Sequence, residues 1–247
     1  MNNIQIPPVV KNLLIINILF FVATWVMQSK GIDLAYYLGA FYFDSPLFKI
    51  WQPISYMFMH GGFTHILFNM FALYMFGSVL ENRWGPKRFL NFYLITGLGA
   101  LALQLLVQSI EVYNITGSIV NHGAVTVDLA EGMAGVNLPG LTREQSQTLL
   151  GIYIGPMVGA SGAIFGLLVA FGMLYPNVEM YIMFIPVPVK AKYIMPVYIV
   201  IELFLGVAKF QGDSVAHYAH LGGALLGFIL VKIWKDRDRH TYYDYYE

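Results

Sequence analysis

Long runs of apolar residues, separated by polar connections, make up most of this chain of 247 residues. Six of the runs approach the length of about 20 residues that an α-helix needs to cross a bilayer. We therefore predict an all-α membrane protein, a bundle of six transmembrane helices that forms a single domain over residues 1–247. The predicted spans cover approximately residues 12–28, 63–80, 88–107, 160–175, 193–208 and 215–234.

Two long connections separate some of these runs. Residues 29–62 are rich in Tyr, Phe and Trp but are interrupted by Gly, Pro and Asp. This composition favours a segment that lies in the membrane interface. Residues 108–159 form a polar insert whose acidic side chains outnumber its single Lys or Arg residue, Arg143. Within the insert, Thr142 is a suitable N-cap for a short helix over residues 142–150.

The composition agrees with a membrane protein and limits its chemistry. The chain is 57% hydrophobic and 11% charged, with a mean hydropathy of +0.61, whereas soluble domains carry about 25% charged residues. A formal net charge of zero argues against nucleic acid as a partner. The absence of cysteine excludes disulfides and thiolate chemistry. No small-x-small cleavage pattern follows the first run, so we expect it to remain as the first span.

Basic residues are distributed unevenly between the two sides of the predicted bundle. If the N-terminus lies inside, the inner segments hold ten of the Lys and Arg residues and the outer segments hold four. Because cytoplasmic segments of membrane proteins are enriched in Lys and Arg, we predict cytoplasmic termini and an insert on the outer side. We expect an integral multi-pass protein of a bacterial inner (plasma) membrane.

Two polar residues at the heads of apolar runs carry the candidate chemistry. Ser161 begins the fourth run and His220 begins the sixth, and polar groups in a membrane cost free energy and mark function. The second, fourth and sixth spans run in the same direction, so both side chains lie at a similar shallow depth on the outer side. A serine hydroxyl needs a base to become a nucleophile, and His220 is the candidate. Neither the fourth nor the sixth span has an acid in its outer half, so we expect a dyad rather than a triad.

An oxyanion formed by attack on a peptide carbonyl needs preorganised hydrogen-bond donors. His65 and Asn69, near the outer end of the second span, are four residues apart and share one helix face. We predict that the oxyanion site consists of His65, the Asn69 amide and the backbone N–H of Ser161.

Glycines predict a close approach of the fourth and sixth spans. Gly162 and Gly166 are four residues apart, as are Gly223 and Gly227, and this small-xxx-small spacing lets two helices pack closely in a membrane. His220 shares a helix face with the second pair. Ser161 and His220 should therefore lie on the packed faces of their helices.

Together these motifs resemble those of the rhomboid intramembrane serine proteases, and the resemblance covers nearly the whole chain. The residues that carry it are His60, His65 and Asn69 in the second span region, Gly159-Ala160-Ser161-Gly162 at the fourth, and Ala219-His220 with Gly223 and Gly227 in the sixth. The resemblance implies a Ser161 nucleophile, a His220 base and the oxyanion site named above. It also implies cleavage of transmembrane protein substrates within the lipid bilayer, near its outer face, with no cofactor and no metal. The sequence does not specify an oligomeric state.

The chain also departs from the family pattern. Trp51-Gln52 stands where many bacterial members carry Trp-Arg. Phe165 stands where some members place a tyrosine beneath the histidine, and its ring can still pack against the imidazole. Glu81 and Arg83 look like the family's Glu-x-Arg pair, for which a structural role is expected.

Three further polar residues have structural interpretations beside functional ones. We expect His60 to form a structural hydrogen bond in the first loop, with a contribution to the oxyanion site as the alternative. We expect His217 to lie near the surface in contact with water or packed against neighbours. For Glu202, in the fifth span, a hydrogen bond between helices is favoured over a role in substrate gating.

Two other functions compete with the protease. One is a catalytically inactive rhomboid-like protein that binds transmembrane segments, but such relatives commonly lack the serine or the histidine. The other is a transporter or metal site built from the histidines. We expect no acid to lie beside these histidines in the fold, and cysteine is absent, which argues against a metal. No inverted repeat is visible either, which argues against a transporter.

Overall fold

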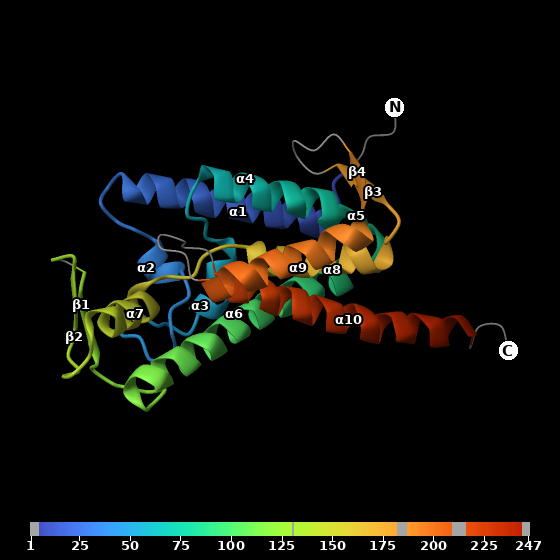
Figure 1. Cartoon of the computed structure of the whole chain (residues 1–247). Coiled ribbons are helices and arrows are strands. Elements are labelled where there is room, and N and C mark those ends of the chain that lie inside the picture. Colours follow the sequence, from blue (N-terminus) through green and yellow to red (C-terminus); the bar gives the residue numbers. More distant parts are fainter. Residues whose placement is uncertain (1–4, 130, 182–186, 209–215, 244–247) are drawn as a thin grey trace.

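The computed structural model describes residues 5–129, 131–181, 187–208 and 216–243, with side chains described up to residue 234. In the described part of the chain, six long helical segments and two small hairpins are present. The helices run roughly along one axis, and the hairpins lie at opposite ends of the molecule (Figure 1). The long segments are α1 (Pro8–Gln28), α4–η2–α5 (Phe63–Trp84), α6 (Pro86–Thr116), α8 (Ser161–Leu174), α9 (Ala191–Ala208) and α10 (His217–Tyr243). The mostly helical bundle predicted from the apolar runs is confirmed.

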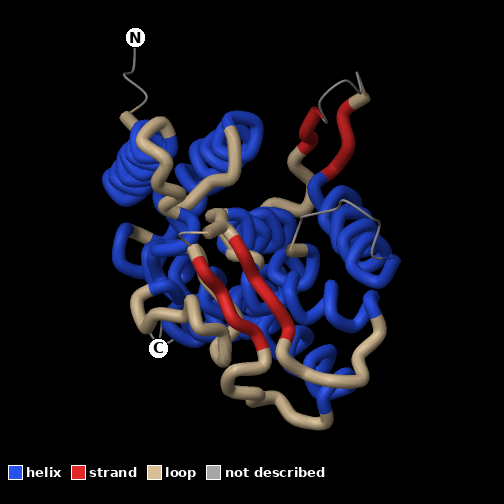
Figure 2. Tube along the Cα trace, turned by 90° about the vertical axis from the view of Figure 1, so that its left-hand side faces the viewer, coloured by secondary structure: helices blue, strands red, loops and turns tan. Residues whose placement is uncertain are grey.

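Short elements complete the chain. The first connection contains α2 (Ala35–Leu38), α3 (Gln52–Ser55) and the 3₁₀ turn η1 (Tyr56–Phe58). The insert contains the antiparallel strands β1 (Val125–Asp128) and β2 (Met133–Val136), followed by α7 (Arg143–Ile154). Strands β3 (Glu179–Tyr181) and β4 (Pro188–Lys190) form a second hairpin between α8 and α9 (Figure 2). Neither hairpin was predicted, because both are too short for a period-two pattern to stand out.

Several helix ends differ from the prediction. Helix α6 continues to Thr116 instead of ending near residue 107. It ends there because Gly117, the residue after Thr116, adopts a left-handed φ of 79°. Helix α1 begins at Pro8, a residue type favoured in the first turn. Helix α10 continues beyond residue 234, and the predicted start of the sixth span at residue 215 lies outside the described residues.

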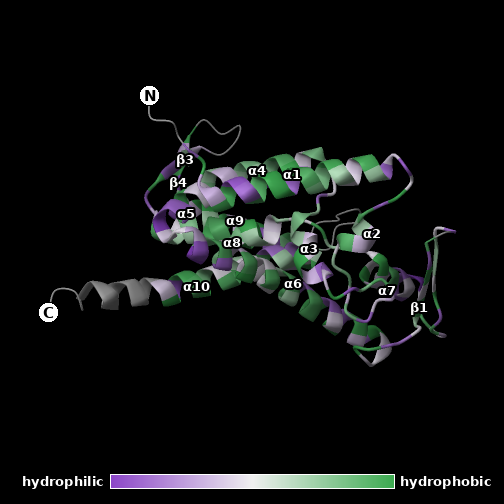
Figure 3. Ribbon diagram, turned by 180° about the vertical axis from the view of Figure 1, so that it is seen from behind, coloured by the Kyte–Doolittle hydropathy of each residue, from purple (hydrophilic) through white to green (hydrophobic). Residues whose placement is uncertain are grey.

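Among the described residues, four segments are long and apolar enough to cross a membrane: α1, α4–η2–α5, α6 and α9. Helix α8 has only 14 residues, and most of them are buried. A helix surrounded by other helices need not match the bilayer thickness, because protein rather than lipid covers it. The ribbon is largely apolar along the helices and hydrophilic near α5 and in several connections (Figure 3). The chain is a membrane protein with α8 at its centre.

Helices α8 and α10 approach each other through glycine, as the sequence predicted. A Cβ atom added at Gly223 would overlap the carbonyl oxygen of Gly162, and one added at Gly227 would lie 2.8 Å from the Cα atom of Gly166. Only glycine permits such contacts between two backbones. This contact holds together the N-terminal ends of α8 and α10, which carry Ser161 and His220.

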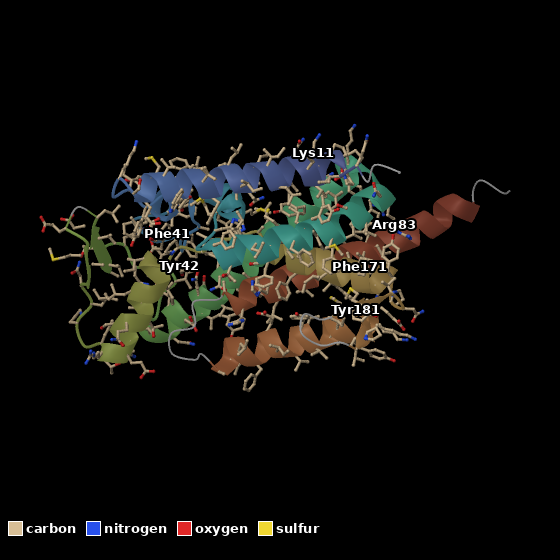
Figure 4. The ribbon with its side chains drawn as sticks, turned by 90° about the horizontal axis from the view of Figure 1, so that it is seen from above. Lys11, Phe41, Tyr42, Arg83, Phe171 and Tyr181 are labelled. Atoms are coloured by element: carbon tan, nitrogen blue, oxygen red, sulfur yellow. The ribbon has the colours of Figure 1, made fainter. Side chains whose placement is uncertain are left out.

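Glu81 and Arg83 lie at the opposite end of the bundle from the first loop, as the labelled Arg83 and Phe41 show (Figure 4). The Glu81 carboxylate accepts hydrogen bonds from the backbone N–H groups of Val9 (2.9 Å) and Val10 (2.8 Å) at the start of α1. A carboxylate at a helix N-terminus satisfies free N–H groups and complements the helix dipole. The Arg83 guanidinium lies over the ring of Tyr175, 5.6 Å from its centroid. These contacts agree with the structural role expected for the pair.

The first loop and the insert are joined into one layer at the other end. Asp44 of the first loop accepts hydrogen bonds from the Tyr153 hydroxyl (2.9 Å) and from the backbone N–H of Asn121 (2.6 Å). The rings of Tyr42 and Tyr153 pack together in a second apolar cluster. Thr142 caps α7 in a capping box with Gln145, so the predicted insert helix is confirmed, although it extends to Ile154.

Candidate active site

Ser161 and His220 form the centre of the site. Ser161 is the first residue of α8, and His220 lies in the first turn of α10. The Nε2 atom of His220 lies 2.8 Å from the Oγ atom of Ser161, which is the hydrogen-bond distance required between a nucleophile and its base. The imidazole is buried, whereas Ser161 is partly exposed. The structure thus brings together the two residues paired from the sequence.

Phe165, one turn along α8 from Ser161, supports the His220 ring. Its ring is stacked on the His220 imidazole, with 4.3 Å between ring centroids and an interplanar angle of 9°. The packing predicted for this residue is confirmed. On its other side, Phe165 contacts Tyr198 of α9 edge-on, with 6.4 Å between centroids. The imidazole plane is therefore fixed by a stack that reaches across to α9.

An acidic residue of α9, Glu202, contacts His220. The Oε2 atom of Glu202 lies 2.9 Å from the Nδ1 atom of His220 and 2.6 Å from the Nδ1 atom of His217. The predicted hydrogen bond between helices at Glu202 is confirmed. The expectation that no acid reaches His220 is wrong, because the acid comes from the fifth span rather than the fourth or sixth. The expectation that His217 lies near the surface is also wrong, since this residue is 7% exposed and bonded to Glu202.

These three residues also correct one argument made from the sequence. The candidate ligand atoms of Glu202, His217 and His220 all lie within 4.8 Å of one another, and two histidines with a glutamate are a donor set that binds zinc in other proteins. The argument that these histidines have no acid beside them is therefore wrong. In the structure, the Nδ1 atoms of both histidines are hydrogen-bonded to Glu202 Oε2.

His65 and Asn69 project from α4 into the same cavity as Ser161 and His220, a space of about 750 Å³. The Nδ1 atom of His65 accepts a hydrogen bond from the backbone N–H of Gly61 (3.4 Å). A neutral imidazole that accepts at Nδ1 carries its proton on Nε2. The Asn69 amide nitrogen is buried and has no hydrogen-bond partner among the described residues. Each residue therefore has a free N–H donor at this cavity.

Gly159 shapes the cavity between His65 and Ser161. Its φ of 130° is rarely adopted by other residues, and a Cβ atom added there would lie 2.9 Å from His65 Nε2 and 3.5 Å from Ser161 Oγ. Any side chain at this position would fill the space in front of both groups. The room beside the serine thus depends on this glycine.

His60 lies behind His65 rather than in the cavity. The edge of one ring faces the other, with 5.1 Å between centroids, and His60 is 4% exposed. Burial and the neighbouring His65 lower the pKa of His60 to about 4, so the ring is neutral at pH 7. His60 is therefore placed to support His65 and does not line the cavity with it.

Comparison with known proteins identifies the family. The rhomboid domain family matches residues 47–236. The chain is 30% identical over 193 residues to RHOMBOID-like protein 5 of Arabidopsis thaliana, covering 78% of this chain and 46% of that protein. It is 27% identical over 188 residues to the mitochondrial RHOMBOID-like protein 12 of the same plant, covering 75% and 47%. It is 24% identical over 164 residues to the rhomboid protease GlpG of Haemophilus influenzae, covering 61% and 84%.

The chain spans about half the length of the two plant relatives. The matched region nevertheless contains every residue of the cavity described above, from His65 in α4 to His220 in α10. Because the family match covers most of the sequence, the chain belongs to the rhomboid family.

Proposed function

We propose that this protein is an intramembrane serine endopeptidase that cleaves transmembrane segments of membrane proteins. The observation that carries the proposal is the 2.8 Å contact between His220 Nε2 and Ser161 Oγ at the wall of a cavity. The aromatic side chains Phe63 and Phe68 line the same cavity and are 70% and 46% exposed. Apolar side chains at the mouth suit a substrate that arrives from the lipid.

The chemistry follows from the positions of the side chains. His220 Nε2 accepts the hydroxyl proton as Ser161 Oγ attacks the scissile carbonyl carbon, and the carbonyl oxygen becomes an oxyanion. Collapse of this intermediate breaks the C–N bond, and His220 returns the proton to the departing amine. Water then attacks the acyl-serine ester, again with His220 as base, and releases the new carboxyl end.

The oxyanion would be held by three donors. The free amide N–H of Asn69 and the Nε2–H of His65 face the cavity, and the backbone N–H of Ser161 lies at the start of α8. A helix N-terminus favours negative charge through its free N–H groups. Donors held in place before the reaction stabilise the transition state more than the substrate.

The orientation is part of the proposal. The excess of Lys and Arg on one side of the predicted topology favours cytoplasmic termini and a site close to the outer face. The relatives come from plants, fungi and bacteria, and several of them are mitochondrial, so the bacterial inner membrane remains a prediction from the sequence alone.

The test is cleavage of a model transmembrane substrate by the purified full-length protein in liposomes. We expect the wild type to cut and both Ser161→Ala and His220→Ala to be inactive. Ser78→Ala is the matched control, because this serine in the same bundle is remote from the cavity and its buried hydroxyl has no partner among the described residues. A fluorophosphonate probe should label the wild type at Ser161. A wild type that neither cuts nor reacts with the probe would instead support an inactive rhomboid-like protein that binds transmembrane segments.

A further inference from the structure

We propose that Glu202 is a positioning residue for His220, so that the catalytic unit is Ser161, His220 and Glu202, contributed by three helices. The proposal rests on the protease function proposed above. The proposed unit adds a third group to the Ser161–His220 dyad. This group comes from α9, a helix that provides none of the residues that line the cavity.

The two contacts of His220 determine which ring nitrogen carries the proton. Nδ1 faces the Glu202 carboxylate at 2.9 Å, and Nε2 faces the Ser161 hydroxyl at 2.8 Å. An ionised carboxylate can only accept hydrogen bonds, so the proton of a neutral ring must lie on Nδ1. The lone pair on Nε2 then faces the serine hydroxyl. This is the tautomer that can act as a base.

The same carboxylate is placed to stabilise the charge that forms during the reaction. When His220 takes the serine proton, the imidazolium is next to Glu202 in mostly apolar surroundings. An ion pair at hydrogen-bond distance is stronger there than in water. In known Ser-His-Asp sites, the acid holds the histidine in the correct tautomer and stabilises the imidazolium without taking its proton.

His217 makes the buried carboxylate possible. An ionised group away from water needs hydrogen-bond donors, and the Nδ1–H of His217 is the second donor to Glu202 Oε2, at 2.6 Å. Both histidines lie on α10, three residues apart and therefore on one face. One carboxylate oxygen from α9 thus accepts from two residues of this face.

The main rival is a purely structural tie between α9 and α10. A second tie exists, because the Tyr218 hydroxyl donates a hydrogen bond to the backbone carbonyl of Gly206 (3.0 Å). The two helices therefore remain linked when Glu202 is changed. A structural role for Glu202 predicts a loss of stability, whereas a positioning role predicts a loss of turnover.

The experiment measures kcat and KM in liposomes for Glu202→Gln, Glu202→Asp and Glu179→Gln. Glutamine keeps the size of the side chain but removes its charge, and its amide allows either tautomer of His220. We expect kcat to fall by about 10²–10⁴-fold, as when the acid of a triad is removed, with KM nearly unchanged. Aspartate should restore part of the loss because it retains the carboxylate. Glu179→Gln is the control, because this glutamate is exposed in β3 and lines neither the cavity of Ser161 nor the one that includes His217, and it should not affect turnover.

A spectroscopic readout does not depend on substrate. The chain has six histidines, so selective ¹⁵N labelling gives a simple spectrum, and His220 Nδ1–H should show a strongly downfield proton resonance that His220→Ala removes. In Glu202→Gln this resonance should move upfield. Failure to find it in the wild type would overturn the proposal even if no substrate were cut.

The outcomes separate the two proposals. Cleavage that does not depend on Ser161 would refute the protease itself. Cleavage that depends on Ser161 but proceeds with an unchanged kcat in Glu202→Gln would refute only the role of Glu202. A lower melting temperature with unchanged kcat would assign Glu202 to the structural tie. Wild-type activity that is lost with a chelator and restored by zinc would replace the positioning role with a metal site at Glu202, His217 and His220.

Discussion

Replacing Gly223 with alanine tests whether the α8–α10 contact sets the geometry of the site. The added Cβ atom would overlap the Gly162 carbonyl oxygen and would lie 2.7 Å from the carbonyl carbon, whereas ordinary contacts begin near 3.4 Å. The atoms it meets belong to the backbone of α8, so no side chain can rotate away. The two helices must move apart, and Ser161 and His220 are attached to them directly beside this contact.

The magnitude can be worked out from the overlap. Restoring an ordinary contact with the oxygen requires a separation of about 1.5 Å, and a displacement of about 1 Å already costs about 10²-fold in rate when it falls between catalytic groups. Overpacking a well-packed interior costs about 1–3 kcal/mol, which the higher helix propensity of alanine offsets by about 1 kcal/mol. We therefore expect a roughly 100-fold loss of kcat with a net destabilisation of at most about 2 kcal/mol.

The assay combines cleavage in liposomes with thermal unfolding in detergent. Gly151→Ala is the matched control, because Gly151 lies in α7 and an added Cβ atom there would meet nothing within 4 Å. The control should keep full activity and gain a little stability from helix propensity. If Gly223→Ala keeps wild-type kcat, the helix contact does not set the catalytic distance. If both variants lose activity equally, the loss does not come from packing, and the reasoning fails.

Two other predictions follow from single contacts. Asn69→Ala should lower kcat by about 10²–10³-fold with little change in KM, because it removes one oxyanion donor; steady-state kinetics that show a higher KM and an unchanged kcat would place Asn69 in substrate binding instead. Glu81→Gln should lower the free energy of unfolding by about 1–3 kcal/mol, because it removes the charge of the acceptor that caps α1. This loss is measured as a lower melting temperature in detergent. The fraction that stays folded should remain as active as the wild type, and a selective loss of turnover would contradict this structural assignment.

Long-range patterns in the sequence predicted most of what assembles the site. Apolar runs gave the six helices because burial in lipid demands many consecutive apolar residues. The glycine spacing gave the α8–α10 contact because only small residues let backbones approach so closely. Topology then placed His65, Ser161 and His220 at one level, and all three line one cavity.

The contact of Glu202 with His220 could not be predicted in the same way. Helix α9 is apolar around most of its circumference, and aromatic side chains such as Tyr193 and Phe204 are exposed on it. A uniform apolar surface does not indicate which face turns inward. Gly206, four residues after Glu202 and also buried, was the available signal that this face packs against another helix.

The same reasoning explains why so many polar groups can lie together inside this bundle. Glu202, His217 and His220 share hydrogen bonds, and His220 is in turn bonded to Ser161, so each of these groups offsets the desolvation of the next. The Asn69 amide nitrogen is the exception in this cavity, since it has no partner among the described residues. A buried donor left unpaired costs about 1–3 kcal/mol, and in the proposed mechanism that cost is recovered when the oxyanion forms beside it. On this proposal the unpaired donor lowers the barrier, because it is satisfied only where negative charge develops in the transition state.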